Sequence, residues 1–407
     1  MRTLATCLAL STLLLCGCSI GPRPGNWGAV AAVPTLSLVD RLVSLPGGAV
    51  VASGVSPDNH VTAVVFDSAH SDWLPAVESP LVTGLRDTDI LANGELLVTS
   101  PQGNWRFRPS SSSWRPAATM SHPRSVYASS SLADGRLLIC GGTDESHLAL
   151  ATCETYNPAI DHWAPSATMS TPRFGPLAAT LPDGRVFVTG GAFNPTQDGS
   201  FDVNLDPLDS SEIFNPATAA FSPAPPYLDP VTDPTLVSLA DGRLLAIGGR
   251  QGSRTRTATT QELDPRTGKW SIRASPTAFG RGVPLPDGRV LLIGAPFGEN
   301  FFGPSGAAGA IYDPAIDLWT PITPPPGTQA GLVGFGPGDA APLPDGRVLT
   351  VSFGDHPSSA VFDPQALPPL PGRDLPLASR EAVLGLAALV GALLLLVLAR
   401  VGWRRHG

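Results

Sequence analysis

The sequence predicts an all-β fold, a seven-bladed β-propeller followed by one C-terminal transmembrane helix. Three observations lead to this prediction. Glycine (43) and proline (44) are frequent among the 407 residues and only 15% of residues are charged, which suits short strands joined by tight turns. A turn sequence recurs seven times at blade-like intervals. Apolar segments occupy both ends of the chain.

The recurring turn is the strongest signal. Five copies have Leu, then Ala or Pro, then Asp-Gly-Arg and an apolar run; the weaker copies are Asn93-Gly94-Glu95 and Gly47-Gly48. The turn glycines are Gly48, Gly94, Gly135, Gly184, Gly242, Gly288 and Gly346, so successive spacings are 46, 41, 49, 58, 46 and 58 by subtraction. These intervals are typical of propeller blades.

Each repeat is predicted to contain four strands. In the third repeat a small-residue strand covers residues 125–131, and Asp134-Gly135 forms the hairpin turn because glycine accepts a positive φ. An apolar strand follows over residues 136–140, a third over 151–156, and Trp163 opens the fourth.

These repeats resemble the Kelch family, whose marks are a double glycine after the second strand, an aromatic on the third and a tryptophan soon afterwards. The resemblance covers residues 25 to 365 and is degraded at both ends. The residues that carry it are Gly141-Gly142, Gly190-Gly191, Gly248-Gly249, Trp73, Trp114, Trp163, Trp270 and Trp319, with Phe221 in place of one tryptophan.

The ends of the repeat region predict how the ring closes. Repeat seven reaches residues 361–364 without a tryptophan, whereas Trp27 and residues 30–34 look like an orphan fourth strand. Kelch propellers commonly pair one terminal strand into the last blade, and such closure removes an exposed edge. We therefore expect seven blades over residues 25–363, with six blades as the alternative.

The N-terminus reads as an export signal. Arg2 precedes an apolar stretch that ends at Leu15-Cys16-Gly17-Cys18, which resembles a bacterial lipobox. The resemblance implies a lipoprotein signal peptide over residues 1–17 and lipidation of Cys18. The alternative is an ordinary secretory signal with incidental cysteines.

The C-terminus carries a second apolar segment. Residues 382–399 have no charged or polar side chain, and Arg400, Arg404 and Arg405 follow. This predicts a transmembrane helix over 382–401 and a basic cytoplasmic tail over 402–407. A Pro-rich linker over 364–381 would separate it from the ring. A sorting signal that is cut after export is the alternative to a retained span.

Composition also excludes several functions. A net charge of −8 argues against a nucleic-acid partner. None of the seven histidines is paired at a metal-ligand spacing, and nucleophile elbows, P-loops and dinucleotide fingerprints are missing from the sequence. We predict neither a metal site nor a cofactor, and no catalytic residue.

Four groups of residues are candidates for particular roles. Cys140 and Cys153 lie on adjacent strands and are expected to form a disulfide in an oxidising compartment. The loops between second and third strands lie on one face and are the expected binding surface. Their candidates are an acidic insertion (Asp198, Asp202, Asp206), an arginine cluster (Arg250, Arg254, Arg256) and an aromatic pair (Phe301, Phe302).

The functional prediction is a non-catalytic scaffold anchored in the cell envelope, with the propeller on the extracytoplasmic side. Its partner would be an envelope protein or a surface glycan, and both chain ends would contact membrane lipid. The alternative, implied by the resemblance, is a carbohydrate-active enzyme related to galactose oxidase or to sialic-acid-processing propellers. Copper-radical chemistry would need tyrosines and histidines around a cysteine cross-link, and the four tyrosines and two non-signal cysteines leave too few groups.

Overall fold

The computed structural model describes residues 27–366, apart from residues 46, 83–86, 101, 194–205, 252–254, 277, 297–307, 324–338 and 353–356. Arg23–Pro364 form one compact unit. The predicted signal peptide, Cys18, the transmembrane segment, the tail and most of the linker lie outside the described residues. Within the described part of the chain, none of the helices is long and apolar enough to cross a bilayer.

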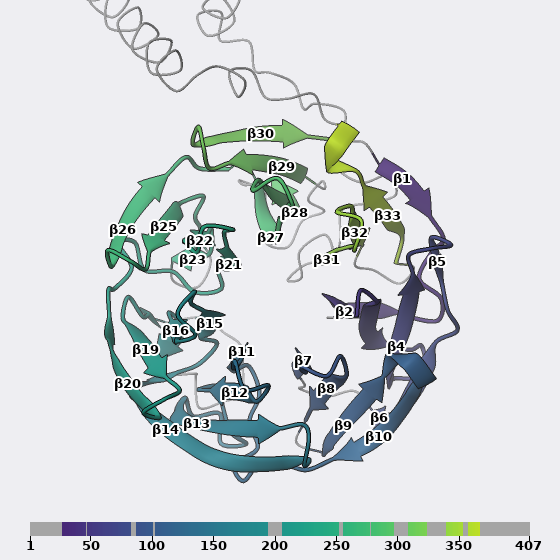
Figure 1. Ribbon diagram of the computed structural model, residues 1–407, viewed down its shortest axis with the longest axis horizontal. Helices are drawn as coiled ribbons and strands as arrows, with labels where there is room; N and C mark the ends of the chain where they lie inside the picture. The colour runs from purple at the N-terminus through teal and green to yellow at the C-terminus, as the bar shows by residue number, and fades with distance from the viewer. Residues whose placement is uncertain are drawn as a thin grey trace, which may run out of the picture. The chain divides into compact units, whose positions relative to one another are not determined.

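The described chain folds into seven antiparallel sheets arranged around a central axis (Figure 1). Blade 1 holds β2 (Leu38–Ser44), β3 (Val50–Val55), β4 (His60–Asp67), β5 (Asp72–Trp73) and β6 (Val77–Val82). Blade 2 holds β7 (Asp87–Ile90), β8 (Leu96–Thr99), β9 (Asn104–Arg108) and β10 (Ser113–Ala117), with the 3-10 helix η1 (Pro109–Ser111). Blade 3 holds β11 (Ala128–Ser131), β12 (Leu137–Cys140), β13 (Leu150–Asn157) and β14 (His162–Arg173).

The remaining blades follow the same order. Blade 4 holds β15 (Leu177–Thr180), β16 (Val186–Thr189), β19 (Ser211–Asn215) and β20 (Ala220–Ala224), with the hairpin β17 (Ala192–Phe193) and β18 (Asp206–Pro207). Blade 5 holds β21 (Thr235–Ser238), β22 (Leu244–Ile247), β25 (Thr260–Asp264) and β26 (Lys269–Arg273), with the hairpin β23 (Arg250–Gln251) and β24 (Thr255–Arg256). Blade 6 holds β27 (Ala278–Pro284), β28 (Val290–Pro296), β29 (Ala308–Asp313) and β30 (Leu318–Ile322).

Blade 7 closes the ring and confirms the seven-blade prediction. It combines β31 (Asp339–Pro342), β32 (Val348–Val351) and β33 (Ser359–Phe362), followed by the 3-10 helix η2 (Pro364–Ala366), with the N-terminal β1 (Trp27–Val30). Trp27 pairs with Phe362 across β1 and β33, and the two ring centroids are 4.9 Å apart. The orphan strand near Trp27 is therefore the fourth strand of the last blade, and the six-blade alternative is wrong.

The recurring Asp-Gly-Arg sequence forms the turn between the first two strands of a blade. Gly135 has a φ of 82° and its N–H donates to the carbonyl of Leu132 at 2.9 Å. The carboxylate of Asp134 accepts from the N–H of Arg136 at 3.1 Å and also pairs with its guanidinium. A side chain at Gly135 would be strained in this left-handed conformation, which explains why glycine recurs at this turn.

The core lies between the blades. The second strands are fully buried on both faces, as the four buried residues of Val186–Thr189 illustrate. Consecutive blades share their clusters: Leu245 of blade 5 packs in one cluster with Leu292 and Tyr312 of blade 6. Each blade is therefore stabilised mainly by its neighbours, as in other repeat proteins.

The fourth-strand tryptophan joins each blade to the preceding one. Its indole N–H donates to a carbonyl at the end of the neighbouring fourth strand, at 2.8 to 3.2 Å. The donors and acceptors are Trp27 to Thr323, Trp73 to Ala31, Trp114 to Val77, Trp163 to Ala118, Trp270 to Pro225, and Trp319 to Ala274. In blade 4, Phe221 packs on Phe214 but has no N–H to donate.

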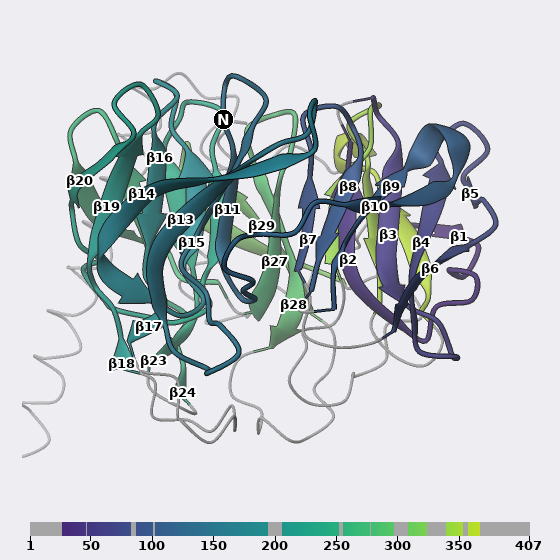
Figure 2. The same ribbon diagram turned by 90° about the horizontal axis from the view of Figure 1, so that it is seen from below.

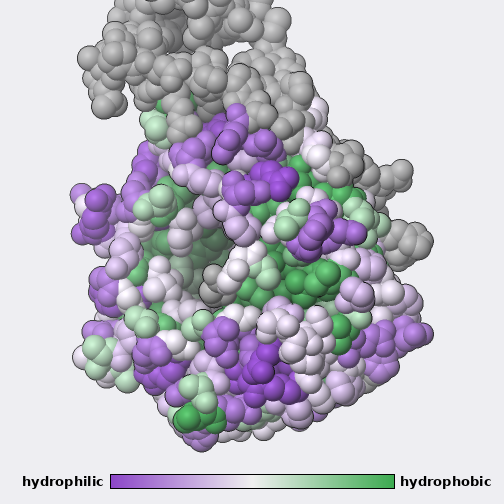
Figure 3. Space-filling model, turned by 45° about the vertical axis from the view of Figure 1, so that its right-hand side comes forward, coloured by the Kyte–Doolittle hydropathy of each residue, from purple (hydrophilic) through white to green (hydrophobic). Residues whose placement is uncertain are grey.

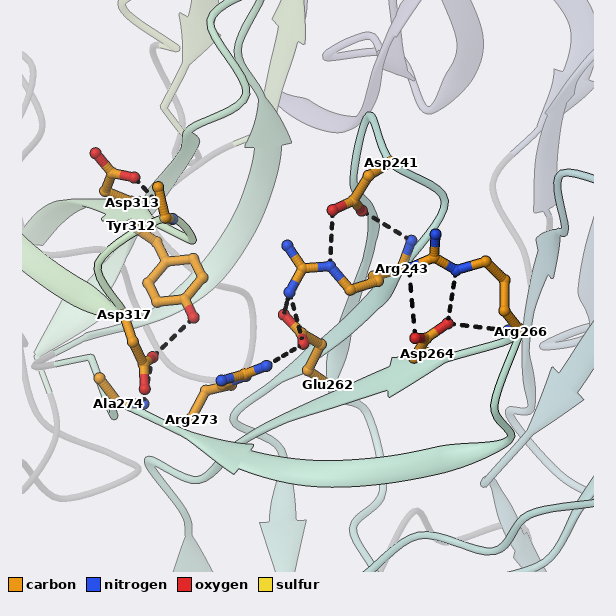
Figure 4. Close-up of polar contacts among 11 residues, drawn as sticks. Asp241, Arg243, Glu262, Asp264, Arg266, Arg273, Ala274, Tyr312, Asp313 and Asp317 are labelled. Carbon is orange, nitrogen blue, oxygen red and sulfur yellow. Dashed lines mark hydrogen bonds and ion pairs between the residues drawn. The ribbon is translucent and has the colours of Figure 1, made fainter. Parts of the chain in front are cut away.

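The weak turn of blade 2 is a charge-reversed copy of the turn in blade 5. In blade 5, Arg243 pairs with Glu262 on the third strand, and Arg273 pairs with the same carboxylate (Figure 4). In blade 2, Glu95 occupies the turn position and Arg106 the third-strand position, and they form an ion pair. Both residues of the pair are exchanged together, so the departure from the repeat preserves a buried interaction.

Candidate functional site

The innermost strands of the seven blades surround the central axis (Figure 1). Their side chains differ around the ring. In blades 4 and 5 the residues on β15 and β21 are small or neutral, for example Ala178 and Thr235. Between blades 6 and 3 they include ionisable groups, which we call the charged arc: Arg281, Asp339, Arg41, Asp87, Asp89 and Tyr127. Figure 3 shows one face of the ring hollowed at its centre.

Two carboxyls of the charged arc lie on β7 and face blade 3. Asp87 accepts a hydrogen bond from the N–H of Val126 at 2.9 Å. Asp89 accepts one from the hydroxyl of Tyr127 at 2.7 Å, and that hydroxyl is 2.6 Å from Oγ1 of Thr99. These contacts join blade 2 to blade 3 through side chains.

The surroundings of these carboxyls favour their neutral forms. Burial raises the pKa of Asp87 to about 7, and the neighbouring Asp89 adds to the rise. Burial also raises the pKa of Asp89, against the opposing effect of its hydrogen bonds from Ser129 and Tyr127. The pKa of Tyr127 lies well above its ordinary value because of burial and both aspartates. Burial therefore favours the protonated form of both carboxyls, and a protonated carboxyl can both donate and accept hydrogen bonds.

The other half of the arc presents cations beside a buried carboxylate. Asp339 accepts from the N–H of Leu42 at 2.7 Å and pairs with Nε of Arg281 at 3.2 Å. The side chain of Arg281 is 43% exposed and Arg41 is also exposed. The arc thus offers guanidinium groups, carboxyls and a phenol to a ligand at the axis, a combination suited to hydroxyl-rich or amide-bearing molecules.

Three arginines near the starts of predicted first strands, Arg124, Arg173 and Arg281, are further sequence candidates for the mouth of the channel, but not all of them reach it. Arg124 and Arg173 are buried, and each pairs with a third-strand glutamate, Glu154 and Glu212 respectively. Arg173 also donates to the carbonyls of Gly190 and Ser210 at 3.0 and 2.8 Å. Two of the three arginines that begin first strands are therefore structural, and only Arg281 lies exposed in the charged arc.

The predicted loop candidates are described only in part. The hairpins β17–β18 and β23–β24 project from the same face of the ring (Figure 2), as expected for the loops between second and third strands. Arg250 pairs with Arg256 in strand register and its guanidinium forms an ion pair with Asp233. Asp206 lies on β18. Asp198, Asp202, Arg254, Phe301 and Phe302 lie outside the described residues.

The two cysteines lie opposite each other on β12 and β13. Cys140 and Cys153 are register partners and their sulfurs are 2.08 Å apart, which is a disulfide. Both side chains are buried between blades 3 and 4. This bond leaves neither cysteine free to cross-link to a tyrosine.

The sequence profile of the Kelch motif family matches residues 124–170 and 236–277, which lie in blades 3 and 5. Its matches coincide with complete four-stranded sheets, in a ring that closes after seven of them. The chain is a Kelch-repeat β-propeller. No curated protein matches the sequence significantly.

Solved structures share the fold of this Kelch propeller at low sequence identity. A fungal alcohol oxidase of the AA5 family, solved in complex with copper, aligns with a TM-score of 0.63 and 16% identity over 84% of this chain and 76% of its own. The solved structure of YjhT aligns with a TM-score of 0.50 and 17% identity over 71% of this chain and 96% of its own. Since 930 solved chains match, the similarity establishes the fold and selects no activity.

The described residues of the Kelch propeller do not fit a copper site. They contain no group of three histidine, cysteine or carboxylate side chains placed to share a metal ion. Tyr156 and Tyr312 hydrogen-bond to the third-to-fourth-strand turns at Asp161 and Asp317. Tyr227 packs on Trp270. These three tyrosines therefore have structural partners within the blades.

Apart from Arg281, the residues of the charged arc were not predicted from sequence. Asp87 and Asp89 have the alternation of a strand, but their repeat lacks the double glycine that marks a complete copy of the motif. Arg41 and Tyr127 are distant in sequence, and both come close enough to act on Asp89 only because the ring brings blades 1, 2 and 3 together. The available signal was the period-two placement of two aspartates on an inner strand, where blades 4 and 5 carry small or neutral residues.

Proposed function

We propose that this Kelch propeller is a non-catalytic binding module whose ligand contacts the charged arc at the axis of the ring. The observation that carries the proposal is the concentration of ionisable groups on blades 6, 7, 1, 2 and 3. Burying a carboxyl such as Asp89 is costly, and β15 and β21, the innermost strands of blades 4 and 5, carry none. Groups with strongly raised pKa values beside charged partners in a hollow are typical of binding sites.

The ligand class follows from the hydrogen-bond donors and acceptors of the charged arc. A protonated carboxyl of the Asp87–Asp89 pair can donate, and the carboxyl oxygens and the Tyr127 hydroxyl oxygen can accept. Exposed guanidinium groups of Arg41 and Arg281 suit carboxylates or ring hydroxyls. We favour a surface glycan over a protein for this site, because a polyol uses both donors and acceptors in a narrow hollow.

A glycan array probed with the full-length protein tests this proposal. Wild type is expected to bind a subset of glycans, and Arg41→Gln and Tyr127→Phe are expected to lose that signal. The matched control is Ser238→Ala, which removes an exposed hydroxyl from the inner strand of blade 5. Equal binding by all three variants would show that the ligand lies elsewhere, for example on the loop face.

A carbohydrate-active enzyme is the second candidate, and one observation favours it. A carboxyl whose pKa is about 7 is suited to proton transfer at neutral pH, and Asp87 is such a group. Nuclear magnetic resonance of an array-positive glycan would reveal turnover. Conversion that Asp87→Asn abolishes while binding persists would replace the non-catalytic proposal by this one.

The cellular location is also part of the proposal. We place the propeller outside the cytoplasm, lipidated at Cys18 and held by a span over residues 382–401, on the sequence pattern of the two ends. Metabolic labelling with a palmitate analogue should mark wild type and miss Cys18→Ala. Label retained by that variant would contradict lipidation at this cysteine.

A further inference from the structure

The fourth strands of the propeller form its outer edges, and most of them carry proline at one fixed position. That position is two residues after the blade's tryptophan, or after Phe221 in blade 4. It is occupied by Pro75, Pro116, Pro165, Pro223 and Pro321 in blades 1, 2, 3, 4 and 6. Proline on an edge strand is a common protection against pairing with another chain.

The strand register explains why this position is the one protected. In blade 1 the N–H of Leu74, one residue after the tryptophan, donates inward to the carbonyl of Val65 at 2.8 Å. Hydrogen bonds in an antiparallel ladder alternate, so the next residue directs its N–H away from the sheet. Pro75 removes that outward donor, and the equivalent prolines of the other blades do the same.

Blades 5 and 7 depart from this rule. Blade 7 has the small Ala29 at this position on β1, whereas blade 5 has a large apolar residue there. The equivalent position on β26 is Ile272, which is the register partner of Gln261 just as Pro223 is the partner of Glu212 in blade 4. By the same alternation, Trp270 and Ile272 direct their main-chain groups outward. The outer edge of β26 therefore presents two N–H and two C=O groups in the spacing that an added strand requires.

The side chains beside this edge are apolar on one face and basic on the other. Ile272 is 54% exposed and Leu228 is 56% exposed. They are neighbours through Gln261, whose Oε1 accepts from the N–H of Leu228 at 2.9 Å. Lys269 and Arg273 alternate with Ile272 along the strand and lie on its other face. Lys269 is exposed and is the single lysine of the chain.

We propose that the outer edge of β26 is a strand-addition site for an extended segment of a partner protein. The segment would alternate apolar residues, which pack against Ile272 and Leu228, with acidic residues, which meet Lys269 and Arg273. Main-chain hydrogen bonds would supply affinity and the alternating side chains selectivity. This site lies at the outside of the ring (Figure 1), away from the charged arc, and is independent of the glycan proposal.

A second copy of the chain is a poorer occupant. Antiparallel pairing of β26 with its own copy about Ser271 places Lys269 of each strand opposite Arg273 of the other, on the same face. Like charges directly opposite each other destabilise a strand pair. The edge is therefore complementary to an acidic strand and not to itself.

Ile272→Pro tests the site with little risk to the fold, because five blades already hold proline there. The probe is a fluorescein-labelled nine-residue peptide that alternates valine and glutamate, titrated into the full-length protein in detergent and followed by anisotropy. We expect saturable binding to wild type and at least about tenfold weaker binding to Ile272→Pro, since the variant loses an outward N–H and gains a steric block. A Val–Lys peptide should not bind wild type.

Carbodiimide coupling provides a second readout, because Lys269 is the only lysine available to cross-link to a peptide glutamate. Mass spectrometry should find the peptide attached to Lys269 in wild type and greatly reduced attachment in Ile272→Pro. The matched control is Ser222→Ala on the outer strand of blade 4, which should behave as wild type. Absence of peptide binding to wild type, equal binding by Ile272→Pro, or a wild-type dimer that Ile272→Pro dissociates would each overturn the proposal.

Discussion

The buried ion pair of blade 4 gives a sharp test of how the repeat is held together. Arg173 and Glu212 are 0% and 5% exposed at their side chains, and their Nη2 and Oε1 atoms are 3.2 Å apart. In blade 5 the equivalent positions hold Val231 and Gln261, both buried. Gln261 is an acceptor, as the glutamate is in blade 4. Its Oε1 accepts a hydrogen bond from the N–H of Asp229 at 3.0 Å, and a carboxylate oxygen of Glu212 accepts one from the N–H of Ser170 at 2.8 Å.

The loss of unfolding free energy follows from the buried groups that each substitution leaves without a partner. Arg173→Val strands the carboxylate of Glu212 in the interior and frees the carbonyls of Gly190 and Ser210, and breaking such a buried pair costs about 3–5 kcal/mol. Adding Glu212→Gln removes the stranded charge and reproduces the arrangement of blade 5. The double variant should therefore recover most of the loss and lie within about 1.5 kcal/mol of wild type.

Thermal unfolding with a double-mutant cycle measures this. With about 340 residues in the ring and an unfolding entropy of about 2.1 cal/mol/K per residue, a loss of 3–5 kcal/mol lowers Tm by about 4–7 °C. Arg173→Val should show that drop, and Arg173→Val combined with Glu212→Gln should show at most about 2 °C. If the two single losses simply add in the double variant, the comparison between blades 4 and 5 is misleading and the reasoning fails.

Three further predictions concern the disulfide, the acidic pair and the ring closure. Replacing Cys140 and Cys153 together by alanine should lower the free energy of unfolding by about 3 kcal/mol, because the disulfide closes a loop with a sequence separation of 13. Urea unfolding measures this loss, and a wild-type midpoint that does not change under reducing conditions would contradict it. The raised pKa of Asp87 means that the folded state binds the Asp87 proton more tightly than the unfolded state. The free energy of unfolding should therefore fall as pH rises from 3.8 to about 7. Unfolding curves across that range should show a flatter dependence on pH for Asp87→Asn. Trp27→Phe should cost about 1 kcal/mol through the lost bond to Thr323 while the ring stays closed, and Trp27→Ala should cost at least about 3 kcal/mol; equal losses would show that the hydrogen bond is unimportant.

Much of the fold was predictable because the sequence repeats itself. Seven turn glycines located seven hairpins, and the φ of 82° at Gly135 shows why other residues are disfavoured there. The tryptophans identified the fourth strands. Trp27 precedes the first repeat, and the seventh repeat lacks a tryptophan, so Trp27 was assigned to the strand that closes the ring. Residues 25 to 363 could therefore be assigned to seven blades before any contact was known.

The charged arc could not be predicted in the same way. Tyr127 lies 38 positions after Asp89, and their contact depends on how closely blades 2 and 3 approach at the axis. A repeat pattern places residues within a blade but says little about which side chains of different blades meet. The sequence also does not predict which way the first-strand arginine side chains point. Arg173 is buried in the blade, whereas Arg281 is exposed.

Departures from the repeat separate structural from functional residues in this ring. Where Arg173 and Glu212 are replaced in blade 5, both change together, and where the turn charge reverses at Glu95, Arg106 reverses with it. Such coupled changes preserve a packed blade and carry no information about ligands. Ile272 has no such compensation: it exposes an apolar side chain on an edge that five other blades protect with proline. Asp87 and Asp89 likewise cost free energy, since desolvation raises both pKa values even though Val126, Tyr127 and Ser129 donate hydrogen bonds to them. Because uncompensated departures cost free energy, a ring that retains them is expected to use them, at its axis and at its outer edge.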